Sequence, residues 1–424
     1  MSIDGAKGRR TRLALVGIFL FAQALMRPPV ALIGFAAVPS DFLFIAVAVG
    51  AAADAVRRRS LPTWDPALGW IALYGASLIV ATLTAADLPR AMAKLATQAY
   101  LLAIPLALVA LVRSAADLKF ALRAWLAGSA LVALVALVGL TAFAAAPDGG
   151  LYHALAFSHG SLPAGLYPRL SLTFLNGNMA ANYLVVSVIL AILAGQLGAV
   201  SPRQRNLLVA GGTVAAMTTI SPGLGGLAIA FGLWGWLAWR GDRPRWTWLA
   251  LGAGIGGATL FVVAAALTLV PYPGAAFVAD LPGGLRMAAS IRLTIWIQAL
   301  TNALAHPLLG RGLGADSVAV HFASPSGISQ TLTDAHNGFL NLAVQCGIVG
   351  LGAFVALLVH VARRSGRWRR GRGNAARLWL GLAFLDGMAY QGLTGSFEDA
   401  RHLWAILGLW LVACRIEQER APAP

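Results

Sequence analysis

Apolar segments of helix length follow one another along almost the whole chain, and they constrain its fold more than any other feature. A helix needs about 20 largely apolar residues to cross a bilayer. Charged residues make up only 11% of the sequence and apolar ones 58%, whereas a soluble domain carries about 25% charged residues. The composition excludes a soluble enzyme, a disordered scaffold and a secreted disulfide framework. Apolar runs, rather than alternating apolar and polar residues, also argue against a membrane β-barrel. The apolar segments lie at approximately 13–33, 40–56, 66–85, 91–112, 121–144, 178–199, 206–220, 223–239, 246–270, 337–362, 378–394 and 402–414.

We therefore predict an all-α polytopic membrane protein of about twelve transmembrane helices, with residues 1–424 as a single integral membrane domain. The net charge of +16 would suggest a nucleic-acid partner in a soluble protein. In a membrane protein, cytoplasmic segments collect Lys and Arg, and these attract anionic lipids. If the N-terminus is cytoplasmic, 24 of the 32 cations fall on the cytoplasmic side. We predict that both termini are cytoplasmic and that membrane lipids, not nucleic acids, are the partners.

Two outer segments, 145–177 and 271–336, are longer than simple connections require. Long loops are where binding and catalytic residues concentrate. On this map the outer side holds six of the seven histidines, namely His153, His159, His306, His321, His336 and His402. We expect any chemistry to take place at the outer face.

Within the larger segment, residues 286–305 have the apolar spacing of an amphipathic helix lying on the outer surface. Arg292 and Trp296 are four residues apart and would share one face of this helix. A guanidinium there can hold a phosphate or pyrophosphate through paired N–H donors. The alternative is an arginine that extends to lipid headgroups.

The next stretch, His306-Pro-Leu-Leu-Gly-Arg-Gly-Leu-Gly314, has three glycines in five residues. Such a loop can expose backbone N–H groups to an anion, or it can be a flexible turn. No strand is predicted before it, so it is not a dinucleotide fingerprint.

The third candidate is His336, shortly before the apolar run 337–362. Asp334 or Thr333 can cap that helix, which would place His336 in its first turn. The positive end of a helix disfavours a charged imidazole, so this histidine should be neutral near pH 7 and able to act as a general base. The alternative is a histidine that hydrogen-bonds to a nearby loop. Further polar groups, Asn176, Asn178 and Asn182, gather at the entry to the 178–199 segment, either as caps or as partners for glycan hydroxyls.

Together these pieces resemble the O-antigen ligase and polysaccharide polymerase superfamily of bacterial membrane proteins. The resemblance rests on Arg292-x-x-x-Trp296, His306-Pro-Leu-Leu-Gly310-x-Gly312-x-Gly314, and His336-Asn337 followed by Gln345-Cys-Gly347-Ile-Val-Gly350. It also includes Phe174-Leu-Asn176-Gly-Asn178 at the entry to a central span. The specific part covers about residues 290–352, and the plan of spans with a large late periplasmic loop extends over nearly the whole chain.

The resemblance implies a metal-independent, inverting, GT-C-like glycosyltransferase of the bacterial inner membrane, without a cofactor and with its active face periplasmic. It would move a glycan from undecaprenyl pyrophosphate to an acceptor such as lipid A-core. By motif match, Arg292 would bind the donor pyrophosphate and His336 would deprotonate or orient the acceptor hydroxyl. The residues expected to bind substrate are Arg286, Arg311, Arg169, Asn178, Asn337 and Trp296.

One position departs from the family pattern. Members commonly carry a Ser-Arg-Gly-like turn whose arginine is a second pyrophosphate ligand. This chain has Ser221-Pro222-Gly223 there. Either Arg169, Arg286 or Arg311 substitutes, or this chain handles its donor differently.

Three other functions fit parts of the pattern. A polysaccharide polymerase shares the plan of a ligase and differs in its acceptor. A transporter of lipid-linked glycans should place ionisable groups along a path inside the membrane, where Asp386 is the main one. A non-catalytic assembly partner would retain the fold and lack the family arginine at position 222.

Overall fold

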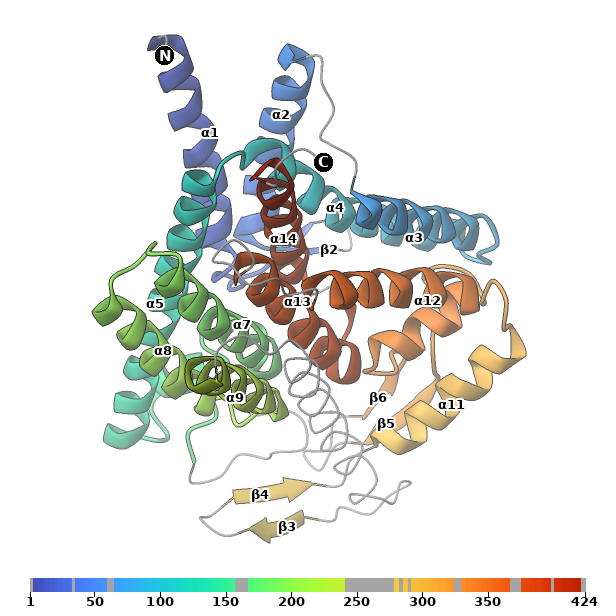
Figure 1. The fold of residues 1–424 in the computed structure, drawn as a ribbon. Helices are drawn as coiled ribbons and strands as arrows, with labels where there is room; N and C mark the ends of the chain where they lie inside the picture. The colour runs from blue at the N-terminus through green and yellow to red at the C-terminus, as the bar shows by residue number, and fades with distance from the viewer. Residues whose placement is uncertain are drawn as a thin grey trace.

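The structure, a computed structural model, describes residues 3–32, 35–58, 65–156, 167–240, 278–281, 285–288, 291–323, 329–366, 375–397 and 400–420. Long helices make up most of it (Figure 1). They are α1 (Ile3–Ala22), α2 (Pro39–Arg58), α3 (Pro66–Leu83), α4 (Leu88–Leu111), α5 (Ala115–Ala145), α7 (Gly177–Gln196), α8 (Pro202–Met217), α9 (Gly225–Arg240), α12 (Gly338–Ser365), α13 (Ala375–Thr394) and α14 (Arg401–Arg420).

Shorter elements connect these helices. They are helices α6 (Gly150–Leu155), η1 (Pro222–Leu224) and α11 (Arg292–Ala305), with strands β1 (Val30–Leu32), β2 (Phe35–Ala37), β3 (Val278–Leu281), β4 (Leu285–Ala288), β5 (Val320–Ala323) and β6 (Ser329–Leu332). The strands form three antiparallel pairs, β1–β2, β3–β4 and β5–β6.

Eleven of the twelve predicted segments coincide wholly or in part with a helix. The remaining one, 246–270, lies outside the described residues. Within the described ranges, six helices are long and apolar enough to cross a membrane: α2, α3, α4, α5, α7 and α12. The chain is therefore an all-α membrane protein, and twelve spans stays a prediction.

The helix starts follow from local sequence. Asp65 accepts the Ala67 N–H at 2.9 Å and is followed by Pro66, which lacks an N–H that would need a partner. Ser201 and Gln204 form a reciprocal capping box at the start of α8. Asn176 caps α7 by accepting the Met179 N–H at 2.8 Å, so the cap alternative holds for this asparagine.

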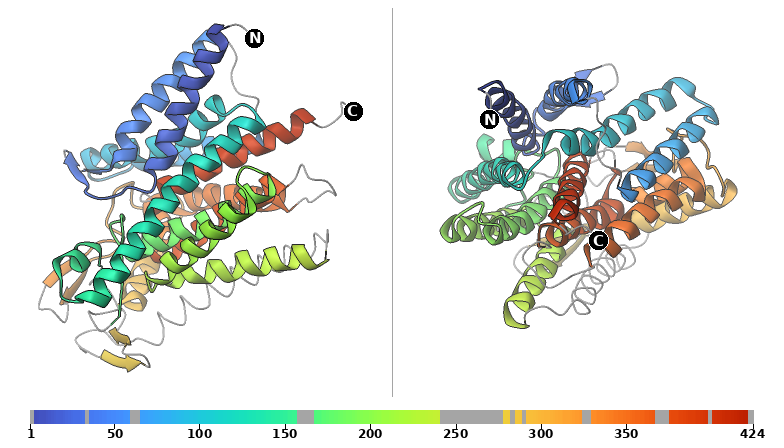
Figure 2. Two further views of the ribbon diagram at one scale, coloured as in Figure 1. Left: turned by 90° about the vertical axis from the view of Figure 1, so that its left-hand side faces the viewer. Right: turned by 45° about the horizontal axis from the view of Figure 1, so that its top comes forward.

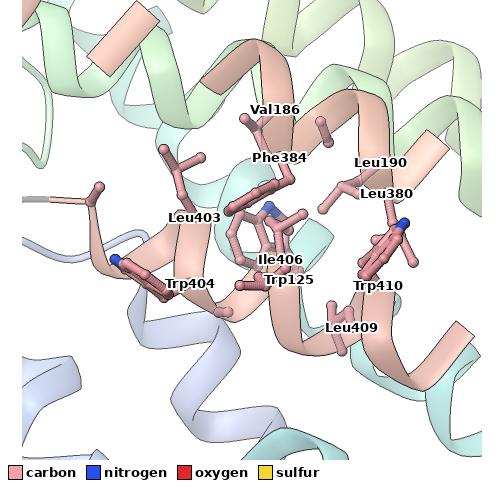
Figure 3. Packing of buried hydrophobic residues seen from close by; sticks show 14 of the residues in the cluster. Trp125, Val186, Leu190, Leu380, Phe384, Leu403, Trp404, Ile406, Leu409 and Trp410 are labelled. Carbon is pink, nitrogen blue, oxygen red and sulfur yellow. The ribbon is translucent and has the colours of Figure 1, made fainter. Parts of the chain in front are cut away.

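The core lies around α7, in which every residue from Met179 to Ala194 is buried. α13 packs against it, and α14 joins α13 to α4. Figure 3 shows the large side chains that fill this region, with Trp125, Trp404 and Trp410 among them. A helix that is apolar on all sides and buried on all sides is the centre of a bundle. α7 therefore provides a fixed base for the asparagines at its N-terminus.

The two chain ends lie toward one end of the helix bundle, and the β3–β4 hairpin lies toward the other (Figure 2, left). α11 and the β5–β6 hairpin lie beside α12 (Figure 1). The segments that carry the sequence motifs are thus gathered on the side of the molecule away from the termini.

Candidate functional site

The chain from α11 to the first part of α12 forms a small unit with its own apolar core. Figure 1 shows α11 alongside α12, and the two helices pack together. The buried side chains of this core are separate from the main one and are Ile295, Ala299, Ala303, Val318, Ala335 and Val344. Because Arg292 begins α11 and His336 precedes α12, this core holds the two predicted catalytic residues in one unit.

The helix in this unit begins later than predicted. Residues Leu285–Ala288 form strand β4, in which Arg286 is paired with Asp280 of β3. α11 starts only at Arg292. The sequence Pro-Gly-Gly at 282–284 is typical of a hairpin turn. The prediction gave more weight to the helical spacing of the apolar residues that follow. Arg286 therefore does not share a helix with Arg292.

The glycine-rich loop after α11 fits into a break in α12. At Gly347 the backbone leaves the helical conformation, with φ 63° and ψ −165°. The loop provides partners for the groups that the break exposes. Ile348 and Val349 donate N–H groups to the carbonyls of Pro307 and Leu308 at 2.8 and 3.3 Å.

On the other side of the break, Arg311 and Gly312 donate to the carbonyls of Val344 and Gln345 at 2.7 and 3.2 Å. The next two N–H groups also have acceptors. Leu313 donates to the Ala81 carbonyl at 2.9 Å, and Gly314 donates to Gln345 Oε1 at 3.3 Å. The alternative of a loop offering N–H groups to an anion is therefore wrong. The glycines join the loop to α12, and this explains why the two motifs occur together.

His336 lies just outside α12, not in its first turn as predicted. Asn337 is the N-cap, and its Oδ1 accepts the N–H groups of Phe339 and Leu340, both at 3.1 Å. Asp334 is occupied elsewhere: it accepts from the His336 N–H at 2.6 Å and from Asn341 Nδ2 at 2.7 Å. Asn337, predicted to bind substrate, therefore serves as a cap.

The environment of His336 favours the neutral imidazole. Burial lowers its pKa below the usual 6.5, and the nearby Arg292 lowers it further, whereas Asp334 opposes the shift. The Asp334 carboxylate lies 3.7 Å from Nδ1. The side chain is still 49% exposed, so a substrate can reach it. A neutral, reachable imidazole can accept a proton near pH 7.

Arg292 interacts electrostatically with two groups of the site, His336 and Tyr390 of α13. Burial lowers the pKa of its guanidinium, and Tyr390 opposes this shift; an arginine nevertheless stays charged at neutral pH. One turn along α11, Trp296 donates from Nε1 to the carbonyl of Ala335 at 3.1 Å. Trp296 thus ties α11 to the residue before His336, a positioning contact for a side chain predicted to bind substrate.

Sequence reasoning did not identify Tyr390, which joins this unit to the bundle. It is buried in α13, and its hydroxyl hydrogen-bonds to Ser221. Ser221 in turn donates to Asn178 Oδ1 at 3.0 Å. The Ser221-Pro222-Gly223 turn is therefore connected to Tyr390 and Asn178. No motif marks an isolated tyrosine inside an apolar helix, so sequence alone could not have singled it out.

Arg169 lies at the same tyrosine. It is only 8% exposed, and it interacts electrostatically with Tyr167 and Tyr390. Burial lowers the pKa of its guanidinium, and the two tyrosines oppose this shift. Of the two candidate cations whose side chains the structure describes, Arg169 interacts with a tyrosine that also interacts with Arg292, and Arg311 does not share this interaction.

Arg311 and Arg286 are the other two candidate cations. Arg311 is exposed, and its Nη1 donates to the carbonyl of Asp316 at 3.4 Å. The backbone of Arg286 lies in β4, and its side chain lies outside the described residues. Asp386, the one intramembrane carboxylate considered for a transport path, is buried one turn before Tyr390 on α13. Over the described ranges, no three His, Cys, Asp or Glu side chains are grouped to hold a metal ion.

Comparison with known proteins finds a match that includes part of this site. Residues 206–355 match the family model described as O-antigen ligase. No curated protein matches the chain. The matched residues include the Ser221–Gly223 turn, Arg292, His336 and Gly347, whereas Arg169, Asn178 and Tyr390 lie outside them.

Proposed function

We propose that this chain, an O-antigen ligase/polymerase superfamily membrane protein by its match at residues 206–355, is a glycosyltransferase that moves a glycan from undecaprenyl pyrophosphate to an acceptor hydroxyl. Arg292 binds the donor pyrophosphate, and His336 is the general base. The observation that carries the proposal is the hydrogen bond from Trp296 Nε1 to the Ala335 carbonyl at 3.1 Å. It joins α11, which begins at Arg292, to the residue before His336, and this supports a cation and an imidazole acting in one site.

The two residues match the two requirements of the reaction. The acceptor hydroxyl must lose its proton as it attacks the anomeric carbon, and His336 accepts that proton. The bond from this carbon to the pyrophosphate breaks, and the leaving group departs with both bonding electrons. Arg292 stabilises its negative charge. Attack opposite the leaving group inverts the anomeric carbon, and two cations in place of a metal make the mechanism metal-independent.

Arg169 provides the second cation that position 222 lacks. It is buried close to Tyr390, as the electrostatic interaction indicates, and it precedes α7 at the Asn-rich entry. The guanidinium of a buried arginine interacts strongly with an anion because little water screens it. Asn178, Trp296 and Asn337 support these groups through their contacts with Ser221, Ala335 and the start of α12.

The arrangement of the chain supports a periplasmic site in the bacterial inner membrane. The termini lie toward one end of the bundle and the β3–β4 hairpin toward the other (Figure 2, left). With 24 of 32 cations on the side of the termini by the charge map, the positive-inside rule makes that side cytoplasmic.

The test is transfer from a polyprenyl pyrophosphate-linked glycan by purified protein, with lipid A-core and with free glycan ends offered as acceptors. Arg292→Ala and His336→Ala should each lower turnover by about 100-fold or more, and EDTA should have no effect. Arg203→Ala, an exposed residue at the start of α8, is the matched control. Full turnover in both site variants would reject the proposed roles, and loss of activity with EDTA would reject metal independence. The preferred acceptor distinguishes ligase from polymerase.

A further inference from the structure

α5 and α8 each carry a row of exposed apolar side chains that begins with cations at one end. The cations are Lys119 and Arg123 on α5 and Arg203 on α8, and both arginines are exposed. Beyond Arg123 on α5 and beyond Arg205 on α8, neither helix contains another charged residue. The exposed apolar members of the two rows are Leu134 and Leu137 of α5 and Leu207, Val214 and Met217 of α8.

The two helices pack against each other (Figure 1), and α7 packs against both. The contacts with α7 fall in reverse order along the chain: they are Trp125–Ser187 and Gly139–Leu170 for α5, and Arg205–Gly195 and Gly212–Val188 for α8. Both helices are therefore antiparallel to α7 and parallel to each other.

Both rows lie on the same side of the α5–α8 pair. The helices meet where a Cβ on Gly211 would stand 3.5 Å from the Ala133 Cβ. Each helical residue is rotated by about 100° from the one before it. Counted from this contact, Arg123 lies about 80° to one side on α5 and Arg203 about 80° to the other side on α8. In parallel helices these opposite rotations bring both side chains to one side, and the contacts with α7 lie on the other.

Arg123 and Arg203 also lie at nearly the same depth. They precede the contact between Ala133 and Gly211 by ten and eight residues respectively, so they differ by about 3 Å along the helices. Beyond Arg123, residues 124–145 of α5 extend for about 33 Å, close to the thickness of a hydrocarbon core. The two cations therefore lie where the lipid phosphates begin.

The acidic side chain at this end of α5 is already paired. Asp117 binds Arg9 at 2.8 Å and Arg12 at 3.1 Å, and these pairs place the start of α5 on the side of the termini. Within the described residues, Lys119, Arg123 and Arg203 form no ion pair with a carboxylate. Their positive charge is therefore left to attract an anion from outside the chain.

We propose that Lys119, Arg123 and Arg203, together with the two apolar rows, bind an anionic phospholipid of the leaflet on the side of the termini. The phosphate lies between the guanidiniums of Arg123 and Arg203, which donate N–H groups to it. The acyl chains lie along the apolar rows. The inference does not depend on the proposed function, because the motifs lie on the side of the molecule away from the termini (Figure 2, left).

The experiment measures lipid binding to purified full-length protein in detergent by native mass spectrometry. The probes are phosphatidylglycerol, which is anionic, phosphatidylethanolamine, which has no net charge, and undecaprenyl monophosphate. The wild type should bind phosphatidylglycerol at least about tenfold more tightly than phosphatidylethanolamine. The double variant Arg123→Gln with Arg203→Gln should reduce this preference to about twofold or less, because it removes both guanidiniums.

Two further variants separate this surface from net charge and from general damage. Arg123→Lys with Arg203→Lys keeps both charges and should retain the preference to within about threefold. Arg420→Gln is the matched control, since Arg420 is also exposed on the side of the termini. It ends α14, whose residues 402–414 are buried and offer no apolar row to lipid, so this variant should bind as the wild type does.

Three outcomes would overturn the inference. The first is a wild type that binds the two phospholipids equally, and the second is a double glutamine variant that keeps the preference for phosphatidylglycerol. The third is tighter binding of undecaprenyl monophosphate than of phosphatidylglycerol that the double glutamine variant abolishes, because the surface would then take a polyprenyl phosphate. An equal loss in Arg420→Gln would attribute the preference to net charge and reject the site as well.

Discussion

Gly347 of α12 lies so close to Leu308 that a Cβ on the glycine would stand 2.2 Å from the Leu308 carbonyl oxygen. This contact is the point where the glycine-rich loop enters the broken helix. The φ of 63° and ψ of −165° at Gly347 fall in a region that only glycine occupies readily. The break therefore depends on one residue both for its conformation and for its space.

Gly347→Ala should lower the free energy of unfolding by about 3 kcal/mol or more, since it adds both backbone strain and a clash. Thermal unfolding in detergent measures this loss. Gly352→Ala is the control in the same helix, where an added Cβ meets nothing within 4 Å. Alanine has the higher helix propensity, so this variant should be unchanged or stabilised by up to about 1 kcal/mol. Equal stability of the two variants would contradict the role of the break.

The rate of transfer should fall on the acid side with an apparent pKa below 6.5, because burial and Arg292 lower the pKa of His336. The sign follows from the mechanism. Only the neutral imidazole accepts a proton, and a lowered pKa keeps it neutral to lower pH. Rates measured from pH 5 to pH 8 test this, and His321→Ala, an exposed histidine of β5, should give the same profile. An acid limb above pH 6.5 would count against His336 as the base.

The helices of this fold were largely predictable, and the site was predictable only in part. Apolar runs locate helices because burial in lipid or in a core requires them. The start of α12 was predicted three or four residues too early, at Asp334 or Thr333 instead of Asn337, since Asp334 and Asn337 are both good caps. Which of the two caps the helix depends on Asn341, one turn inside α12, because its Nδ2 donates to the Asp334 carboxylate.

Neither the contacts of Tyr390 nor the role of the glycine-rich loop could be predicted from the sequence. Both depend on contacts between segments far apart in the chain, such as Ser221 with Tyr390 and Pro307 with Ile348. Local spacing carries no information about such pairs. Arg169 was one of three cations that we predicted as possible substitutes at position 222, and its burial and its neighbours distinguish it from the exposed Arg311.

If Arg169 compensates for Pro222, an arginine at position 222 should restore part of what Arg169→Gln removes. Pro222 lies between Ser221, which bonds to Tyr390, and Gly223, which supports its ring. We expect Arg169→Gln to raise the donor KM about tenfold. The double variant Pro222→Arg with Arg169→Gln should recover at least about a third of that loss on the logarithmic scale. A correctly folded double variant with no recovery would show that the two positions serve different groups.

Asp117→Asn should destabilise the protein by about 2 kcal/mol or more. Asp117 is 1% exposed and pairs with Arg9 at 2.8 Å and Arg12 at 3.1 Å, which joins α1 to α5. Removing one partner of a buried pair is costly because the remaining charges lose their compensation. The matched control is Asp316→Asn, whose pair with Arg90 at 2.6 Å is 41% and 52% exposed. Exposed pairs contribute about 0–1 kcal/mol, so unfolding in detergent should separate the two variants, and equal losses would contradict this ranking.

α11 should contact the hydrocarbon region of the membrane on the face away from its core. Ile297, Leu300 and Leu304 are 58%, 51% and 69% exposed, and their spacing places them on one side of the helix. Leu308 and Ile348 are also exposed, at 67% and 57%, and α12, which contains Ile348, is itself long and apolar enough to cross a membrane. A helix with apolar side chains on both faces is stable only if the outer one is also removed from water.

A nitroxide label on Leu304→Cys in liposomes should therefore be relaxed more by oxygen, which concentrates in lipid, than by a water-soluble nickel chelate. The two native cysteines, Cys346 and Cys414, are buried and should not compete for the label. Ala319→Cys, exposed in the segment between α11 and β5, should show the opposite preference. If Leu304→Cys were relaxed mainly by the nickel chelate, α11 would lie in water, and its predicted place at the membrane surface would be wrong.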